Sequence, residues 1–281
     1  MIENKFDVVV IGSGPGGYVC AIRLAQLGFK TAIIEKYKSL GGTCLNVGCI
    51  PSKSLLDSSH HYDDIMNHAV NHGIEISGEI NLNFNKMIER KNGVVNQTVK
   101  GIDYLMNKNN ITVFQGKASF VDDKTIKVSE NKENIIFDKC IIATGSKPIS
   151  LPFIELDKKR VITSTEALSL KEIPKHLVII GGGVIGLELG QVYNRLGSEV
   201  TVIEYSDKIT PFMDNDISRE LLKILKKQKI KFYLSHQVYE VDNKGKNIIV
   251  KAKNKNNEII NFDCDYCLVS VGRKPYTDGL G

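Results

Sequence analysis

The sequence contains no apolar run long enough to cross a membrane, no low-complexity linker and no block of like charge. A membrane-spanning helix needs about 20 mainly apolar residues, so a membrane protein is not expected. The formal net charge of +5 comes from dispersed lysines, and we interpret the lysine-rich stretch 223–231 as the polar face of an amphipathic helix, which argues against nucleic-acid binding. The first residues lead directly into a strand pattern, so we expect no signal peptide and predict a cytoplasmic protein.

Residues suited to a metal site are also scarce. Cys264 and Cys267 form a C-x-x-C pair, but no second pair lies nearby to complete a zinc site, and alternation along one strand would turn the two side chains to opposite faces. Cys20 and Cys140 are interpreted as packing residues. The histidines between residues 60 and 72 lie on polar helical segments and are predicted to be solvated. We therefore predict no metal site.

A glycine loop between a strand and a helix is present near the start of the chain. Residues 6–11 are an apolar, β-branched run typical of a buried parallel strand, and residues 19–25 have a helical pattern. Between them stands G-S-G-P-G-G at 12–17. Strand, G-x-G-x-x-G and helix follow each other in the order of a dinucleotide-binding unit, in which the helix N-terminus attracts a pyrophosphate.

Each position of this loop has a physical task. Gly12 allows the tight turn, Gly14 lets the backbone approach a pyrophosphate, and Gly17 lets the helix pack closely on the strand. A second strand pattern at 31–34 ends in Glu35, at the spacing expected for an acidic residue that binds ribose hydroxyls. A glycine loop without a ligand is the alternative, and the complete set of parts disfavours it.

A second copy of the same device lies far downstream. A strand pattern at 176–180 leads into G-G-G-V-I-G at 181–186, followed by a helical pattern at 187–196. The next strand pattern, 199–203, ends in Glu204. Two dinucleotide sites on one chain predict a protein that moves electrons between two nucleotide cofactors.

Two cysteines directly follow the first fingerprint. Cys44 and Cys49 are five positions apart, which is marginal for a disulfide on a regular helix, so a bridge between them implies a distortion near Gly48. Pro51 and the apolar residues after it predict a helix that starts near Cys49, a setting in which thiols are reactive. Two buried cysteines that act as small apolar residues are the alternative. In a reducing compartment a persistent disulfide is more often catalytic than structural.

The order of the predicted elements gives the fold class. Strands alternating with helices predict an α/β protein with two Rossmann-like dinucleotide-binding domains built on parallel sheets. The boundaries are placed at residues 1–148 and 149–274. Short strands over 111–142, with turns at 122–123 and 131–132, predict an antiparallel meander inserted between parallel strands.

Four segments together resemble the pyridine nucleotide-disulfide oxidoreductases. They are GGTCLNVGCIPSK at 41–53, IIATGSKP at 141–148, GGGVIGLELGQVYNRLGSEVTVIE at 181–204, and VSVGRKP, which ends at Pro275. The resemblance covers essentially the whole chain. It implies that the first domain binds FAD, that the second binds NAD, and that Cys44 and Cys49 form a redox-active disulfide.

The resemblance also assigns residues. The catalytic residues that it implies are Cys44, Cys49, Lys53 and Glu188, with Lys53 beside the flavin and paired with Glu188. The residues implied for FAD are Gly12, Gly14, Gly17, Glu35, Lys36, Gly42, Thr43, Lys53, Gly116, Thr144, Gly145 and Ser146. Those implied for NAD are Gly181, Gly183, Val184, Ile185, Gly186, Glu188, Glu204, Val238 and Gly272.

The implied reaction is oxidation of dihydrolipoamide on a lipoylated protein, with NAD⁺ as the acceptor. Implied partners are a lipoylated acyltransferase or glycine-cleavage carrier protein, and the resemblance implies a homodimer for the full-length enzyme. Ser52 and Glu204 favour the lipoamide branch of the family, because glutathione reductases tend to carry a lysine at the first position and a basic residue at the second. The carboxylate of Glu204 would repel a 2′-phosphate. A mercuric or glutathione reductase, and a nucleotide-binding fragment without turnover, remain alternatives. The family's interface domain and its C-terminal histidine–glutamate pair are absent, so we expect an N-terminal portion in which 275–281 begin the return to the FAD domain.

Overall fold

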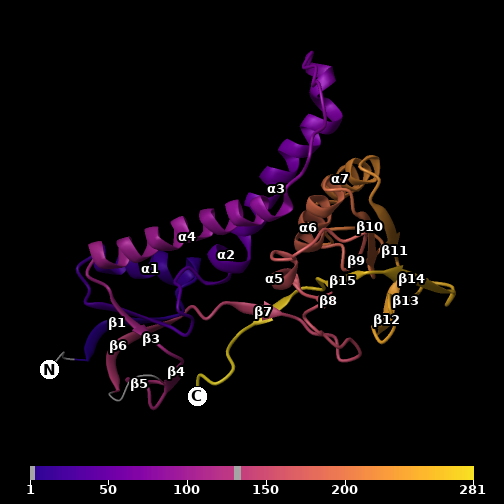
Figure 1. Cartoon of the computed structure of the whole chain (residues 1–281). Helices are drawn as coiled ribbons and strands as arrows, with labels where there is room; N and C mark the ends of the chain where they lie inside the picture. Colours follow the sequence, from indigo (N-terminus) through magenta and orange to yellow (C-terminus); the bar gives the residue numbers. More distant parts are fainter. Residues whose placement is uncertain (1–3, 130–133) are drawn as a thin grey trace. The chain divides into compact units, whose positions relative to one another are not determined.

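The computed structural model describes residues 4–129 and 134–281, and its contacts group them into two compact units. The first unit contains the described residues up to 51, residues 92–129 and 134–147, and residues 274–281; the second contains 52–91 and 148–273 (Figure 1). The helical stretch 52–91 thus groups with the second unit. The domain boundaries at 148 and 274 stay predictions, and the expected turn at 131–132 lies outside the described residues.

The first unit is built around a six-stranded sheet in the order β3-β2-β1-β6-β5-β4. Its strands are β1 (Lys5–Ile11), β2 (Thr31–Glu35), β3 (Thr112–Gln115), β4 (Ala118–Phe120), β5 (Thr125–Val128) and β6 (Ile135–Ile142). Strand β1 runs parallel to β2 and β6, and β2 runs parallel to β3. Strands β4, β5 and β6 form an antiparallel meander, as predicted. The unit also holds α1 (Pro15–Gln26) and α2 (Gly42–Val47).

The second unit contains a five-stranded parallel sheet in the order β11-β10-β9-β15-β8 and an antiparallel sheet in the order β12-β13-β14. The strands are β8 (Val161–Ile162), β9 (His176–Ile180), β10 (Glu199–Glu204), β11 (Lys231–Leu234), β12 (Gln237–Asp242), β13 (Ile248–Lys253), β14 (Ile259–Cys264) and β15 (Tyr266–Val269). The helices are η1 (Asp64–His68), η2 (Ala69–His72), α5 (Ser164–Ala167), α6 (Val184–Arg195) and α7 (Asn215–Lys227). The predicted α/β class with two Rossmann-like sheets is confirmed.

Two helices contain residues of both units, namely α3 (Cys49–Asp63) and α4 (Phe84–Lys108). The remaining strands, β7 (Ser146–Pro148) and β16 (Arg273–Pro275), pair with each other. Among the described residues, no helix is both long and apolar enough to cross a bilayer.

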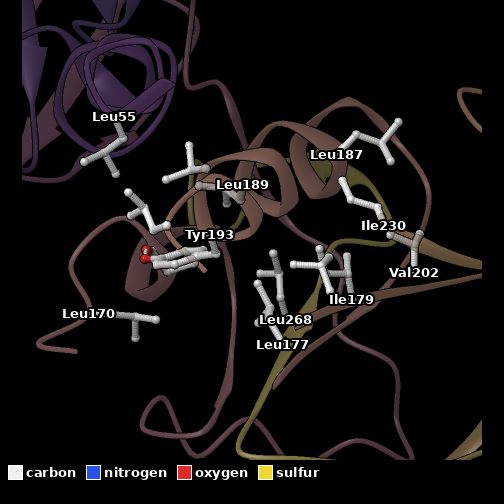
Figure 2. Packing of buried hydrophobic residues seen from close by; sticks show 14 of the residues in the cluster. Leu55, Leu170, Leu177, Ile179, Leu187, Leu189, Tyr193, Val202, Ile230 and Leu268 are labelled. Carbon is white, nitrogen blue, oxygen red and sulfur yellow. Dashed lines mark hydrogen bonds between the residues drawn. The ribbon is translucent and has the colours of Figure 1, made fainter. Parts of the chain in front are cut away.

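The central strands have both faces buried, which explains their continuous apolar sequences. In β9, Leu177 and Ile179 belong to the cluster that packs under α6, whereas Val178 and Ile180 belong to the cluster beneath β12–β14. Tyr193 of α6 is fully buried in the first of these clusters (Figure 2). Its hydroxyl donates a hydrogen bond to the Ala167 carbonyl, and burial raises the pKa of this phenol, so it stays protonated as a donor.

The expectation that Cys264 and Cys267 lie on one strand is wrong. Cys264 ends β14 and Cys267 lies in β15, because the chain turns at Asp265, whose carboxylate accepts the N–H groups of Lys175 and His176. Both cysteines are buried in the same cluster, and desolvation raises the pKa of Cys264 to about 12. They pack as apolar residues. In the described part of the chain, no group of three or more His, Cys, Asp or Glu residues is placed to hold a metal.

The lysine-rich stretch 223–231 is helical only as far as Lys227, so its interpretation as one helix face is wrong beyond that residue. Lys229 has a left-handed φ of 68° and donates its N–H to the Lys226 carbonyl, which closes the helix in the manner of a C-terminal cap. Lys231 already belongs to β11.

Candidate functional site

Strand register brings the residues predicted to bind the first nucleotide to one edge of the first sheet. Ile11 of β1 is level with Ile34 of β2 and with Ile142 of β6, so Gly12, Glu35 and Ala143–Ser146 follow the carboxyl ends of neighbouring strands. Gly116 is buried directly after β3 and donates its N–H to the Glu35 carbonyl at 2.8 Å. The carboxyl edge of a parallel sheet is where α/β folds bind ligands.

The glycines of the first loop are required by close contacts. A Cβ atom on Gly17 would lie 1.8 Å from the Gly12 carbonyl oxygen, and one on Gly12 would lie 2.4 Å from the Ala143 oxygen. Gly14 is the N-cap of α1, which has no capping side chain and no acidic residue in its first turn. The positive end of the α1 dipole thus meets no acidic side chain in the first turn of the helix, and this suits it to a pyrophosphate.

Glu35 is buried and its carboxylate is fixed by three donors. Oε2 accepts the N–H of Ser13 at 2.9 Å and its hydroxyl at 2.6 Å, and Oε1 accepts the N–H of Tyr37 at 3.0 Å. Sequence reasoning did not single out Ser13. Its position inside the loop was the available signal, since a residue at the second loop position lies beside the end of the neighbouring strand.

The second loop repeats this construction at the edge of the second sheet. Ile180 of β9 is level with Ile203 of β10 and with Val269 of β15. A Cβ atom on Gly181 would lie 2.6 Å from the Ser270 oxygen, and one on Gly186 would lie 2.6 Å from the Gly181 oxygen. Helix α6 also begins without a capping side chain or an early acidic residue.

Glu204 is buried at the end of β10. Its Oε2 accepts the N–H of Gly182 at 2.6 Å, and its Oε1 accepts the N–H of Ser206 at 2.7 Å. A carboxylate held at this place presents negative charge beside the glycine loop. Such a site accepts hydrogen bonds from ribose hydroxyls and disfavours a phosphate.

The cysteine segment is interrupted where the sequence predicts a distortion. Helix α2 ends at Val47, Gly48 follows, and α3 begins at Cys49. A Cβ atom on Gly48 would lie 2.8 Å from the Thr43 oxygen and 3.3 Å from the Cys44 Cα atom, so only glycine allows this close return of the chain. Cys44 is half-buried, and Cys49 is exposed at the start of α3.

Asn46 anchors the same segment and was not expected from the sequence. Its Nδ2 donates to the carbonyl oxygens of Leu40 and Gly42, each at 2.9 Å, while its Oδ1 accepts the Ser39 hydroxyl at 2.9 Å. Three bonds to the backbone and side chain before Cys44 fix the approach to α2. An amide between the two cysteines was the only signal in the sequence.

Lys53 and Glu188 lie 135 residues apart in the sequence and form an ion pair in the second unit. Lys53 Nζ is 2.6 Å from Glu188 Oε1, and the Ser52 hydroxyl donates to Oε2 at 3.3 Å. The lysine side chain is 59% exposed and that of the glutamate 25%. Two neighbouring residues of α3 thus hold one carboxylate of α6.

The other predicted site residues are placed as follows. Lys36 lies over the Tyr276 ring at 3.6 Å, and Tyr276 donates its N–H to the Gly145 carbonyl at 3.0 Å. Val238 is buried in the core beneath β12–β14, and Gly272 accepts the Ile149 N–H at 3.0 Å. The remaining predicted residues that are exposed or half-buried are Gly42, Thr43, Thr144, Gly145, Ser146, Gly183, Val184 and Ile185. Their ligand roles stay predictions.

Comparison with known proteins gives a consistent set of relatives. A family profile described as pyridine nucleotide-disulphide oxidoreductase matches residues 6–281. The mitochondrial dihydrolipoyl dehydrogenase of Schizosaccharomyces pombe is 45% identical, over 99% of this chain and 55% of that protein. The dihydrolipoyl dehydrogenase of Trypanosoma brucei brucei is 44% identical, over 100% of this chain and 60% of that protein.

Other relatives have different names. The leghemoglobin reductase of Glycine max is 46% identical, over 99% of this chain and 54% of that protein. Among solved structures, the HOCl-induced flavoprotein disulfide reductase RclA from Escherichia coli matches with a TM-score of 0.82 and 30% identity, over 98% of this chain and 58% of that chain. The chain thus spans somewhat more than half the length of the relatives it matches.

Proposed function

The chain belongs to the pyridine nucleotide-disulphide oxidoreductase family, and we propose that it serves the oxidation of dihydrolipoamide groups with NAD⁺ as the electron acceptor. The observation that carries this proposal is the cysteine segment itself. Two thiols lie on either side of a helix interruption that only glycine allows, directly after a complete glycine loop and its buried Glu35. The names of the relatives 44–45% identical to the chain support the choice of substrate.

Members of the family use FAD and NAD, and both loops have the chemistry to hold a dinucleotide. Each offers the uncapped start of a twelve-residue helix and a buried carboxylate whose position is fixed by backbone N–H groups. We place FAD at the first loop because the cysteine segment continues from it, and NAD at the second. Bound FAD and NAD supply the two-electron transfer that connects the thiols with the nicotinamide.

The chemistry of the chain's own residues is thiol–disulfide exchange. One thiolate of dihydrolipoamide attacks Cys44 Sγ, the Cys44–Cys49 bond breaks, and Cys49 leaves as a thiolate. The second substrate thiol gives up its proton to solvent and attacks the substrate sulfur of the mixed disulfide; the bond to Cys44 Sγ breaks, Cys44 leaves as a thiolate, and lipoamide is released. The substrate loses two electrons, and the cysteine pair gains them. Glu188 holds the Lys53 ammonium in place, one helical turn after Cys49 along α3.

The alternatives within the family differ in their substrates. Glu204 supports NAD over NADP, and this favours the lipoamide branch over the glutathione reductases. Turnover with Hg²⁺ would indicate a mercuric reductase, and bound nucleotide without any turnover would indicate a nucleotide-binding module. As partners we propose a lipoylated acyltransferase or glycine-cleavage carrier protein, and a homodimer. The cytoplasmic location stays a prediction, and the name of the Schizosaccharomyces pombe relative gives mitochondria for that protein.

The proposed function predicts a yellow protein that reduces NAD⁺ when dihydrolipoamide is added. The purified protein should carry bound flavin, measured by its visible absorbance, and should form NADH only when both dihydrolipoamide and NAD⁺ are present. Oxidised glutathione and Hg²⁺ tested with NADPH serve as the control substrates, and they should give little turnover. Bound flavin with dye reduction but no reaction with dihydrolipoamide would assign a different function to the same fold.

Glu204 should decide which nicotinamide cofactor binds. Replacing it with glutamine keeps one oxygen acceptor for the backbone N–H groups and removes the charge that repels a 2′-phosphate. We expect the preference for NADH over NADPH, measured as the ratio of dissociation constants, to fall about tenfold or more. An unchanged ratio of dissociation constants in Glu204→Gln would show that Glu204 does not contact the adenosine ribose of the cofactor. Glu199→Gln, on the same strand but at its other end, is the control and should leave the ratio unchanged.

A further inference from the structure

The two glycine loops repeat the same hydrogen bonds at the same sequence separations. Glu35 Oε2 accepts the Ser13 N–H across 22 residues, and Glu204 Oε2 accepts the Gly182 N–H across 22 residues. The Oε1 atom of each glutamate accepts the N–H two residues further on. The second loop therefore repeats these backbone hydrogen bonds at matching positions, whereas the bond from the Ser13 hydroxyl to Glu35 Oε2 has no counterpart at Gly182.

The copy extends to the bend that follows each glutamate. Gly41 donates its N–H to the Ser13 carbonyl at 2.9 Å, and Thr210, at the same distance along the chain from its glutamate, donates to the Gly182 carbonyl at 2.9 Å. Both residues have left-handed backbones, with φ of 96° at Gly41 and 44° at Thr210. Because β-branched residues avoid this region, the bend is imposed at Thr210 by its surroundings. There its hydroxyl lies 3.0 Å from that of Ser218.

The copies diverge at the next residue, which is Gly42 in the first loop and Pro211 in the second. Gly42 has a φ of 58° and packs on the first loop so closely that a Cβ atom on it would lie 2.6 Å from the Gly14 Cα atom. Proline is restricted to a φ of about −65° and cannot follow this path. The chain therefore leaves the second loop at Pro211.

The consequence is visible around Gly183, the counterpart of Gly14. No atom of the described residues lies within 4 Å of the position that a Cβ atom on Gly183 would take. Phe212, directly after Pro211, is 102% exposed, and Met213 is 45% exposed. The turn at 41–42 packs on the first loop, whereas the corresponding turn at 210–211 leads the chain away from the second loop.

We propose that the residue at this position, Gly42 in the first loop and Pro211 in the second, sets how long a nucleotide stays bound at each loop. The Gly42–Gly14 contact closes the first loop, so its nucleotide leaves only when the backbone at 41–42 moves. Pro211 keeps the second loop open, so its nucleotide enters and leaves without such a movement. This inference rests on the proposed function, which requires a cofactor retained at one loop and a dinucleotide exchanged at the other.

The test is the dissociation rate of NADH from Pro211→Gly, followed by stopped-flow displacement of NADH fluorescence. Glycine can adopt the path of Gly42, so dissociation should slow about three- to tenfold. Pro211→Ala is the matched control, because alanine loses the proline ring but still avoids positive φ, and it should dissociate NADH at the wild-type rate. Equal slowing in both variants, or no slowing in Pro211→Gly, would overturn the proposal.

The reciprocal change is Gly42→Ala, whose Cβ atom cannot fit against the Gly14 backbone. FAD should be lost about tenfold faster or more, measured by flavin fluorescence after dilution into an excess of a competing flavin dinucleotide analogue. NADH dissociation should stay at the wild-type rate, which shows that the second unit is folded. Unchanged FAD loss would overturn the proposal for the first loop. A wild-type protein that binds neither nucleotide would instead contradict the proposed function.

Discussion

Replacing Cys49 with serine should abolish NAD⁺ reduction by dihydrolipoamide, a loss on the order of 10⁴-fold or more in turnover. A serine oxygen cannot form or break the bond to Cys44 Sγ, so the exchange step has no leaving thiolate. Cys44→Ser should be equally inactive, because the substrate then has no sulfur to attack. The measurement is the initial rate of NADH formation with saturating dihydrolipoamide.

Two controls separate loss of the thiol pair from loss of the fold. Oxidation of NADH by an artificial dye uses the nucleotide loops but not the cysteines, so both variants should keep this activity. Cys20→Ser, on α1, changes a half-buried cysteine outside the pair and should keep dihydrolipoamide turnover. Turnover retained in Cys49→Ser beside a normal Cys20→Ser protein would remove Cys49 from the reaction.

The repeated strand, glycine loop and helix could be predicted from the sequence because each of their signals is local. A β-branched run, a G-x-G-x-x-G loop and a helical period stand next to each other, and β1, α1 and β2 form where these patterns predict them. The interruption at Gly48 was predictable for the same reason, since it follows from the spacing of Cys44 and Cys49. Close contacts at each loop then explain why glycine occupies these positions.

Contacts between distant segments could not be predicted in this way. The turn at Asp265 that separates Cys264 from Cys267 depends on Lys175 and His176, whose N–H groups it accepts. The prediction that both cysteines lie on one strand failed because a C-x-x-C spacing fits a single strand as well as two strands joined by a tight turn. Ser13 has no motif of its own and gains its role from Glu35, 22 residues away. The pairing of Lys53 with Glu188 was expected only from the family resemblance.

Replacing Gly17 with alanine should weaken FAD binding about 10- to 100-fold. The added Cβ atom would lie 1.8 Å from the Gly12 carbonyl oxygen, so α1 has to move away from β1. This movement displaces the N-terminus of α1 from the place proposed for the pyrophosphate. Flavin titration into the apoprotein measures the change. Gly186→Ala is the corresponding variant of the second loop and should weaken NADH binding instead, because its Cβ atom would lie 2.6 Å from the Gly181 oxygen.

Gly16 provides the matched control within the same loop. Within the described part of the chain, no atom lies within 4 Å of a Cβ atom on Gly16, so Gly16→Ala tests the effect of a methyl group without the clash. FAD binding should therefore be unchanged in Gly16→Ala. NADH binding by Gly17→Ala reports whether the second unit is intact, and we expect the wild-type value. If Gly17→Ala binds FAD as tightly as Gly16→Ala does, the first loop tolerates the displacement of α1, and the assignment of FAD to this loop is contradicted.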